Sequence, residues 1–402
     1  MCTSIAFEKE ENGPQLTART LDFFFPLETK IAEGNSEKYS FVGMDECPGK
    51  YKFAALTYKD TQFLFDGMNE KGLSISSLWS PTAKYPNDDD IKSGKKVVQL
   101  TNVVAYILNA YDSVETLFKD LGPNGYLVIS FNQDLASKKI HEFIDKSGGT
   151  LPLHFIVTDS EGKSLVIEFI NGETKLYKSF SPIDTDEVSC NGVLTNYPPY
   201  NIHKDNLSLY GTLSCTNQED GINGSGLYGM PGDVTPQSRF IRASKMKEAT
   251  MFPQSADDLK EYTDYKNLND EDLKKVIRKN SIMQCLRLIQ DCLVPTGAVI
   301  ERAKEDRAKD DPTIFNPTKK EKPCWFVGNY TQLFFVRNHQ DKIMYFQYYN
   351  DPTLYYYSLN GEELEDSWNK KVPHYMDDKK LIENYANLDI VIQIKLQETV
   401  EV

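Results

Sequence analysis

Cys2 is the first residue whose side chain could act as a nucleophile. A small second residue permits removal of the initiator methionine, which would leave a thiol and a free α-amine on one residue. An ordinary α-amine has a pKa of about 7.7–8 and an ordinary thiol one of about 8.5, so both groups are close to their reactive forms near neutral pH. The amine can then serve as the base for its own side chain. Cysteine at this position also occurs without any role, so the hypothesis needs support from other residues.

Arg19 and Asp22 have opposite charges and lie at the end of an expected strand. On their own they could form a simple surface ion pair. Beside a nucleophilic Cys2, the guanidinium would stabilise a thiolate and the carboxylate would hold the terminal ammonium group. The pair would therefore support catalysis only if the fold places it beside Cys2.

Asn196 follows an expected apolar strand and precedes Pro198 and Pro199. A side-chain amide presented in this way can donate a hydrogen bond to an oxyanion, and loss of one such donor typically lowers a rate by about 10²–10³. The alternative interpretation is an ordinary turn asparagine. Arg239 follows a loop rich in glycine and proline, residues 229–236, at an expected helix start. It either belongs to a capped helix or points into a pocket.

The remaining cysteines and the histidines are widely spaced and form no recognisable metal motif. The sequence has no Cys-x-x-Cys pair and no His-Glu-x-x-His segment, so we expect neither a structural zinc ion nor metal catalysis, and no cofactor. It also lacks a convincing Cys/His pair, which disfavours a cysteine peptidase. The remaining cysteines and the histidines are Cys47, Cys190, Cys215, Cys285, Cys292, Cys324, His141, His154, His203, His339 and His374.

The composition narrows the class of protein. The chain has 402 residues, of which 40% are hydrophobic, and a formal net charge of −14. So acidic a surface repels phosphate groups, which argues against nucleic acid or an anionic membrane as the main partner. No stretch approaches the roughly 18 apolar residues of a membrane span, and the start Met1–Ile5 shows no basic and apolar signal segment. We therefore expect a soluble, cytoplasmic protein.

Most of the chain shows the patterns of β-strands, interrupted by helical segments. Residues 97–121 predict two helices, of which the second is capped by Asp112 or Ser113, and residues 271–292 predict a long one. The expected strands are residues 3–8, 15–22, 52–58, 62–67, 73–78, 125–131, 154–158, 165–169, 332–337, 343–349, 354–358 and 390–396.

Strands, then helices, then strands again within one chain predict an α+β fold of two antiparallel sheets with helices packed outside. We expect a single domain over residues 2–402. Two stretches, 253–272 and 301–323, are rich in Asp, Lys, Glu and Pro and are predicted to be surface insertions.

Six short motifs in register resemble the choloylglycine hydrolase family, which contains bile salt hydrolases and penicillin V acylases. Their order and rough spacing are kept over about residues 2–358. The resemblance implies the αββα sandwich of N-terminal nucleophile (Ntn) hydrolases. The motifs are Met1-Cys2-Thr3, Arg19-Thr20-Leu21-Asp22, Asn69-Glu70-Lys71-Gly72-Leu73, Leu194-Thr195-Asn196-Tyr197-Pro198, Pro231-Gly232-Asp233 leading to Ser238-Arg239-Phe240, and Tyr348-Tyr349-Asn350-Asp351-Pro352.

The resemblance also implies a reaction: hydrolysis of a linear amide in an N-acyl amine, such as a conjugated bile salt or penicillin V, through a thioester on Cys2. Arg19 and Asp22 would support the thiol and the amine of Cys2, Asn196 would donate to the oxyanion, and Arg239 would complete the polar cluster. An N-acyl homoserine lactone or another acyl amine is an alternative substrate. The alternative from a different class of function is a non-catalytic binding protein of the same fold. A homo-oligomer, either dimer or tetramer, is also compatible with the resemblance.

The expected substrate-binding residues are aromatic. Trp79 stands where family members commonly have Asn or Tyr, and its backbone N–H would be the second oxyanion donor. Phe24 and Phe25 directly follow Asp22, and they could line an apolar acyl pocket, as could Phe63. The alternative for these phenylalanines is packing in the core.

Overall fold

The structure is a computed structural model. It describes residues 2–9, 13–25, 27, 29–35, 49–58, 61, 63–86, 91, 94–132, 136, 138–147, 149–179, 190–197, 199–200, 202, 230–250, 252, 268–295, 329–361, 370–371 and 391–393. Within this part of the chain, no helix combines the length and the apolar character that crossing a bilayer requires.

The first sheet contains the strand that begins at Cys2. Its pairings are antiparallel except for the outermost one, between β15 and β16. In spatial order it consists of β12 (Val193–Thr195), β1 (Cys2–Ala6), β2 (Leu16–Phe23), β13 (Tyr330–Asn338), β14 (Ile343–Tyr348), β15 (Tyr355–Ser358) and β16 (Lys370–Lys371).

The second sheet is built from the middle of the chain, and again only its outermost pairing, between β17 and β3, is parallel. In spatial order it consists of β11 (Glu173–Lys178), β10 (Ser164–Ile170), β9 (Leu153–Thr158), β6 (Ser74–Trp79), β5 (Leu64–Asn69), β4 (Phe53–Tyr58), β3 (Thr29–Gly34) and β17 (Val391–Gln393).

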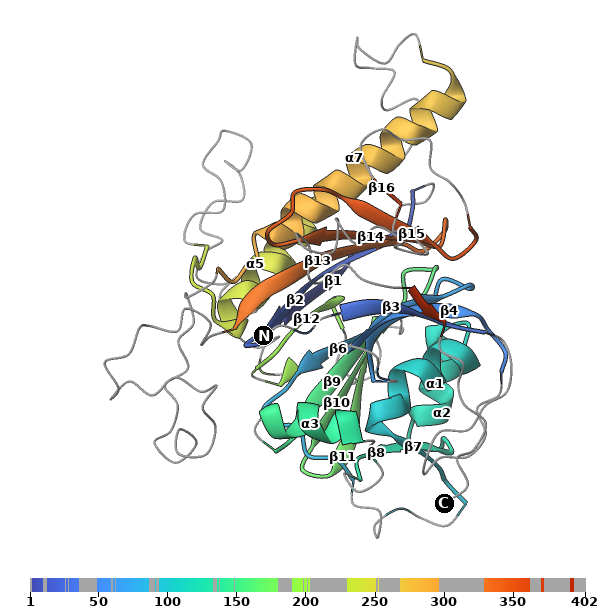
Figure 1. Ribbon diagram of the computed structural model, residues 1–402, viewed down its shortest axis with the longest axis vertical. Coiled ribbons are helices and arrows are strands. Elements are labelled where there is room, and N and C mark those ends of the chain that lie inside the picture. Colours follow the sequence, from blue (N-terminus) through green and yellow to red (C-terminus); the bar gives the residue numbers. More distant parts are fainter. Residues whose placement is uncertain are drawn as a thin grey trace, which may run out of the picture.

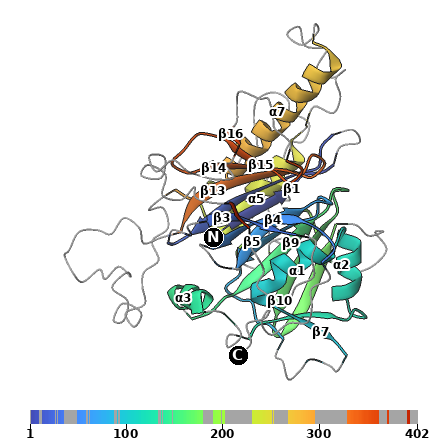
Figure 2. The same ribbon diagram turned by 45° about the vertical axis from the view of Figure 1, so that its right-hand side comes forward.

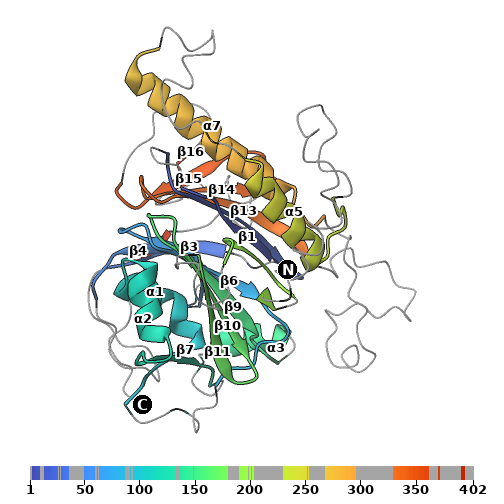
Figure 3. The same ribbon diagram turned by 180° about the vertical axis from the view of Figure 1, so that it is seen from behind.

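Helices cover the outer face of each sheet. Helices α5 (Pro236–Glu248) and α7 (Asp270–Gln290) lie on the first sheet, which is seen best from behind (Figure 3). Helices α1 (Val103–Ala110) and α2 (Val114–Leu121) pack against the second sheet on its far side (Figures 1 and 2). The order of layers is therefore helix, sheet, sheet, helix, and the predicted αββα sandwich is confirmed.

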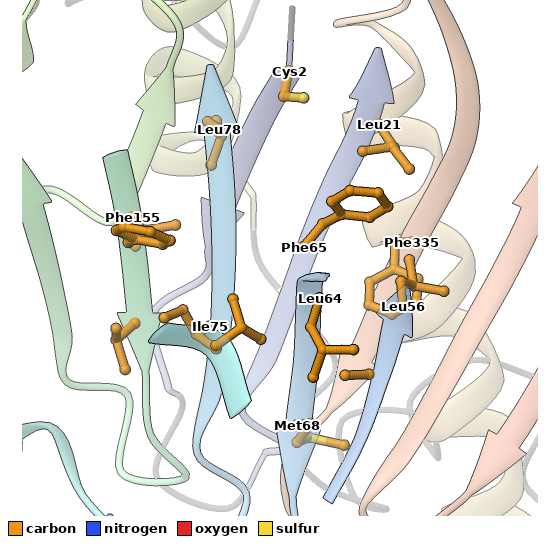
Figure 4. Packing of buried hydrophobic residues seen from close by; sticks show 14 of the residues in the cluster. Cys2, Leu21, Leu56, Leu64, Phe65, Met68, Ile75, Leu78, Phe155 and Phe335 are labelled. Carbon is orange, nitrogen blue, oxygen red and sulfur yellow. The ribbon is translucent and has the colours of Figure 1, made fainter. Parts of the chain in front are cut away.

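The core lies between the two sheets. Figure 4 shows Leu21 and Phe335 of the first sheet facing Phe65 and Leu78 of the second, with Cys2 at one end of the layer. Because side chains alternate across a strand, Cys2 and its partner Leu21 point into this layer. The nucleophile candidate therefore starts a strand whose position is fixed on both sides, by β12 and β2.

Several local predictions were right and others need correction. The predicted strands 154–158 and 165–169 are confirmed as the hairpin of β9 and β10, and Ser113 caps α2 through a hydrogen bond from the Thr116 backbone N–H. The first of the two helices predicted within residues 97–121 begins later than expected: β7 (Lys96–Gln99) pairs in parallel with β8 (Leu127–Ser130), and a short 3-10 helix (Leu100–Asn102) precedes α1. Val97 and Val98 fit the pattern of a helix as well as that of a strand, and their pairing with β8 places them in a strand.

The end of the predicted insertion 253–272 overlaps α7, which begins at Asp270. Asn269 caps this helix by accepting from the Asp272 backbone N–H, and three acidic residues occupy the first turn, where they favour the helix dipole. Residues 253–267 and the whole of 301–323 lie outside the described residues. Strands β3 and β11 and helix α3 (Lys138–Lys146) had not been predicted.

Candidate active site

Cys2 is buried, with 4% of its surface exposed, at the first position of β1. Its backbone nitrogen donates to Oδ1 of Asn196, and its thiol lies 3.7 Å from the backbone carbonyl of Asp22. Its own carbonyl oxygen accepts a 2.7 Å hydrogen bond from Arg239. The main chain and the side chain of Cys2 are thus bound by different groups.

Arg19 reaches the thiol from the layer between the sheets. Its Nη2 lies 3.3 Å from the Cys2 sulfur and donates to the Ser77 carbonyl at 2.7 Å. Its Nη1 forms an ion pair with Asp66 of β5 at 2.5 Å. A guanidinium held within hydrogen-bonding distance of a buried sulfur stabilises the thiolate form over the neutral thiol.

Asp22 lies on the opposite face of β2 from Arg19, because an odd separation along a strand reverses the side-chain direction. Its carboxylate accepts from Thr20 at 3.0 Å and from Thr331 at 2.7 Å, and Arg239 is 3.7 Å away. Burial raises the pKa of Asp22, while Arg239 and the two threonines oppose this shift. The carboxylate thus faces the helix layer rather than the thiol.

Arg239 is supplied by the first turn of α5. Pro236 opens this helix and Thr235 caps it by accepting from the Ser238 backbone N–H, which fixes the helix start beside β1. The buried guanidinium donates to the Thr3 hydroxyl at 2.5 Å as well as to the Cys2 carbonyl, and to Oδ1 of Asn196 at 3.1 Å. Burial lowers the pKa of Arg239, and the charge of Asp22 opposes this shift.

Asn196 follows β12 directly, and both ends of its amide are engaged. Oδ1 accepts from the Cys2 backbone nitrogen and from Arg239, while Nδ2 donates to the Trp79 carbonyl at 2.8 Å. Because one end of the amide faces two donors and the other end faces a carbonyl, only one orientation of the amide satisfies all three contacts. The contact from Trp79 to Asn196 is therefore made by the Trp79 carbonyl.

The predicted aromatic residues belong to one ring cluster. Phe24 and Phe25 are half-buried and pack against Phe23, whose ring is 5.8 Å from that of half-buried Trp79. Phe63 is fully buried, so any role in binding substrate would need the cluster to rearrange. The roles of these residues in substrate binding remain predictions.

Phe143 of α3 joins these rings but was not singled out from the sequence. Its ring lies 5.6 Å from Phe23, 5.7 Å from Phe25 and 5.3 Å from Phe63. The helical spacing of buried Ile140, Phe143 and Ile144 was the available signal, but the helix is short.

Other described cysteines offer a contrast with Cys2. Cys292 lies behind Arg239, and burial raises the pKa of its thiol to about 11. Burial also raises the pKa of Cys285 well above its ordinary value. These thiols therefore stay protonated at neutral pH, and within the described residues neither of them has a hydrogen bond from a guanidinium like that of Arg19 to Cys2.

A two-sheet sandwich between helical layers, with a buried cysteine at the start of an interior strand, is the arrangement of the N-terminal nucleophile hydrolases. The family model of choloylglycine hydrolases, described as linear amide C–N hydrolases, matches residues 2–264. The chain belongs to this family, and its reaction class is the hydrolysis of a linear amide C–N bond. The expected enzyme class is confirmed, which removes the ground for a non-catalytic binding protein.

Individual relatives support the assignment to this family. A bile salt hydrolase/transferase of Clostridium perfringens is 30% identical over 274 residues, which cover 62% of this chain and 72% of the relative. A penicillin V acylase of Pectobacterium atrosepticum is 25% identical over 260 residues, covering 60% of this chain and 58% of the relative. The crystal structure of a mutant conjugated bile acid hydrolase from Clostridium perfringens has a TM-score of 0.61 at 20% identity, covering 92% of this chain and 95% of that one.

Proposed function

We propose that this enzyme hydrolyses an N-acyl amine with an apolar acyl group, a conjugated bile salt or penicillin V, with Cys2 as the nucleophile. The observation that carries the proposal is the arrangement at Cys2. Its sulfur contacts a buried guanidinium, while its nitrogen and carbonyl are bound by Asn196 and Arg239. A nucleophile bound at three separate points is held in one orientation toward the substrate, which lowers the entropic cost of attack.

Removal of Met1 converts the Cys2 nitrogen from a peptide amide into a primary amine. This amine takes the thiol proton, the resulting thiolate attacks the substrate carbonyl carbon, and the carbonyl oxygen becomes an oxyanion. Asn196 donates one Nδ2 hydrogen to Trp79, and its second hydrogen supplies the oxyanion donor. The Arg19 guanidinium stabilises the sulfur in its anionic form before attack.

The tetrahedral intermediate collapses when the C–N bond breaks. The leaving amine takes the proton from the Cys2 ammonium group, and a thioester remains on the sulfur. The same α-amine then takes a proton from water, whose oxygen attacks the thioester carbonyl. Breakage of the C–S bond returns the thiol and releases a carboxylic acid. Asp22 and Arg239 hold the strand around Cys2 in place throughout.

The aromatic cluster supports an apolar acyl group. Half-buried Phe24, Phe25 and Trp79 present ring faces and edges near the start of β1, where a flat hydrocarbon gains contact area. The relatives described above, a bile salt hydrolase/transferase and a penicillin V acylase, suggest the two leading substrates. An N-acyl homoserine lactone remains the alternative because its acyl chain is also apolar.

The test is amine release from glycine- and taurine-conjugated bile acids, penicillin V and acyl homoserine lactones by the mature enzyme. We expect turnover of a bile acid conjugate or penicillin V, and loss of activity to background in Cys2→Ala. Cys292→Ala serves as the matched control, because it removes a buried thiol whose pKa is raised to about 11. It should retain activity. Equal turnover by Cys2→Ala and the parent would refute the proposed mechanism.

A further inference from the structure

Asp66 and Arg337 form a buried charged group outside the motifs of the sequence analysis. Asp66 lies on β5 of the second sheet and is fully buried, and Arg337 lies on β13 of the first sheet with 1% of its surface exposed. The two residues form an ion pair across the interface of the sheets. Charges buried this deeply have lost their hydration, which is unfavourable unless their surroundings compensate for it.

Asp66 binds both arginines at once. One carboxylate oxygen pairs with Arg19 at 2.5 Å, and the other pairs with Arg337. Arg337 is itself fixed by hydrogen bonds of 3.1 Å to the hydroxyls of Thr17 and Ser76, and its guanidinium lies 4.4 Å from the centre of the Phe335 ring. A continuous row therefore runs from Arg337 through Asp66 and Arg19 to the Cys2 sulfur.

The charges of this row do not cancel. Two guanidinium groups and one carboxylate sum to +1, and the Cys2 thiolate would bring the sum to zero. Burial and the charge of Arg19 lower the pKa of Arg337. Guanidinium groups retain their charge in proteins because their ordinary pKa is above 12. In a medium of low dielectric constant, an uncompensated positive charge attracts an anion strongly.

The neighbouring titratable groups leave this balance intact. On the helix side of β1 and β2, Asp22 and Arg239 have opposite charges and lie 3.7 Å apart. On the far side of Thr17 is His339, and burial lowers its pKa to about 3, so it is neutral near neutral pH. The excess positive charge therefore resides in the row that ends at the sulfur.

We infer that Asp66 and Arg337 are positioning residues for the reaction: Asp66 aims Arg19 at the Cys2 sulfur, and Arg337 supplies the charge that makes the row favour a thiolate. The inference rests on the proposed role of Cys2 as the nucleophile. It differs from a purely structural tie between the sheets, which would affect stability while leaving the ionisation of Cys2 unchanged.

Arg337→Gln and Arg337→Lys test the inference. Both can donate to Asp66, Thr17 or Ser76, but only lysine keeps the charge. The ultraviolet absorbance of the Cys2 thiolate is titrated against pH, each variant being compared with the same protein carrying Cys2→Ala. For Arg337→Gln we expect the midpoint to rise by about one pH unit, which is a tenfold lower thiolate fraction below the midpoint, because one buried unit charge is removed from the row that ends at the sulfur.

Arg337→Lys should keep the parental midpoint, and so should Lys163→Gln, which removes one positive charge from an exposed pair with Glu115. An unshifted midpoint in Arg337→Gln, or an equal shift in Arg337→Lys, would overturn the inference. The titration needs no turnover, so its outcome is separate from that of the substrate panel. A Cys2→Ala enzyme with full activity would refute the proposed function instead.

Discussion

The main chain of Cys2 is bound by residues at the end of β12 and in α5, and its side chain is bound from the layer between the sheets. Asn196 and Arg239 hold the nitrogen and the carbonyl, whereas Arg19 contacts the sulfur. This division follows from strand alternation, which places Arg19 and Asp22 on opposite faces of β2. The positively charged neighbour thus acts on the thiol, and the Asp22–Arg239 pair orders the strand.

The contribution of Asn196 can be measured directly. Asn196→Ala removes the Nδ2 donor, and we expect kcat to fall by about 10²–10³, because the oxyanion forms only after attack. KM should change far less. Tyr197→Phe is the control, since Tyr197 is adjacent in sequence and exposed. It should leave kcat roughly unchanged. A fall confined to KM would mean that Asn196 binds substrate without stabilising the transition state.

At the residue scale, the sequence identified the groups with distinctive chemistry. Cys2, Arg19, Asp22, Asn196 and Arg239 were all singled out, and the structure brings them together, although their roles remain proposals. Asp66, Arg337 and Phe143 were not singled out. Their importance depends on which strands and helices face one another, and no local pattern encodes that.

At the scale of elements, the sequence predicted those elements whose contacts lie within one short stretch of the chain. Hairpins such as β9–β10 were recognisable because alternation and a turn lie within one short stretch. Strand β11 is polar at most positions and has only one buried residue, and it forms because β10 offers an edge for pairing. Whether β3 pairs with β4 was equally invisible in sequence, since register is set by neighbours distant in the chain.

His339 joins two elements and gives the fold a dependence on pH. It follows β13, its Nδ1 donates to the Gly72 carbonyl at 2.6 Å, and its Nε2 is 3.0 Å from the Thr17 hydroxyl. Gly72 has a φ of +80° and sits so close that an added Cβ would lie 2.5 Å from the His339 carbonyl oxygen. The turn between β5 and β6 is therefore locked against the end of β13.

Burial lowers the pKa of His339 to about 3, against an ordinary value of 6.5. Below pH 6.5 the unfolded chain binds a proton that the folded chain excludes, so stability is present above that pH and is lost as the pH falls. Between pH 6.5 and about 3 we expect this group to remove about 1.4 kcal/mol of unfolding free energy per pH unit.

Chemical denaturation of the parent and of His339→Gln across this pH range measures the effect. Glutamine can still donate to the Gly72 carbonyl but does not titrate, so the variant should lose stability less steeply on acidification. Parallel stability–pH curves for the two proteins would contradict this assignment.

At the scale of the whole molecule, the active site depends on two sheets that are formed by distant parts of the chain. Arg19 comes from the first sheet, Asp66 from the second, and Arg337 from a strand more than 300 residues after Arg19 in the sequence. The family resemblance predicted the layered architecture correctly. The charged row between the layers became visible only when both sheets were in place.

The central claim is that a mature Cys2, with its amine free, forms a thioester with the substrate. Rapid quenching of the enzyme at saturating substrate, followed by peptide mass analysis at low pH, tests it most directly. We predict that the N-terminal peptide begins at Cys2 and carries the mass of the acyl group, and that hydroxylamine removes this mass. An active enzyme whose N-terminal peptide retains Met1, or whose acyl group is attached to another residue, would contradict the claim.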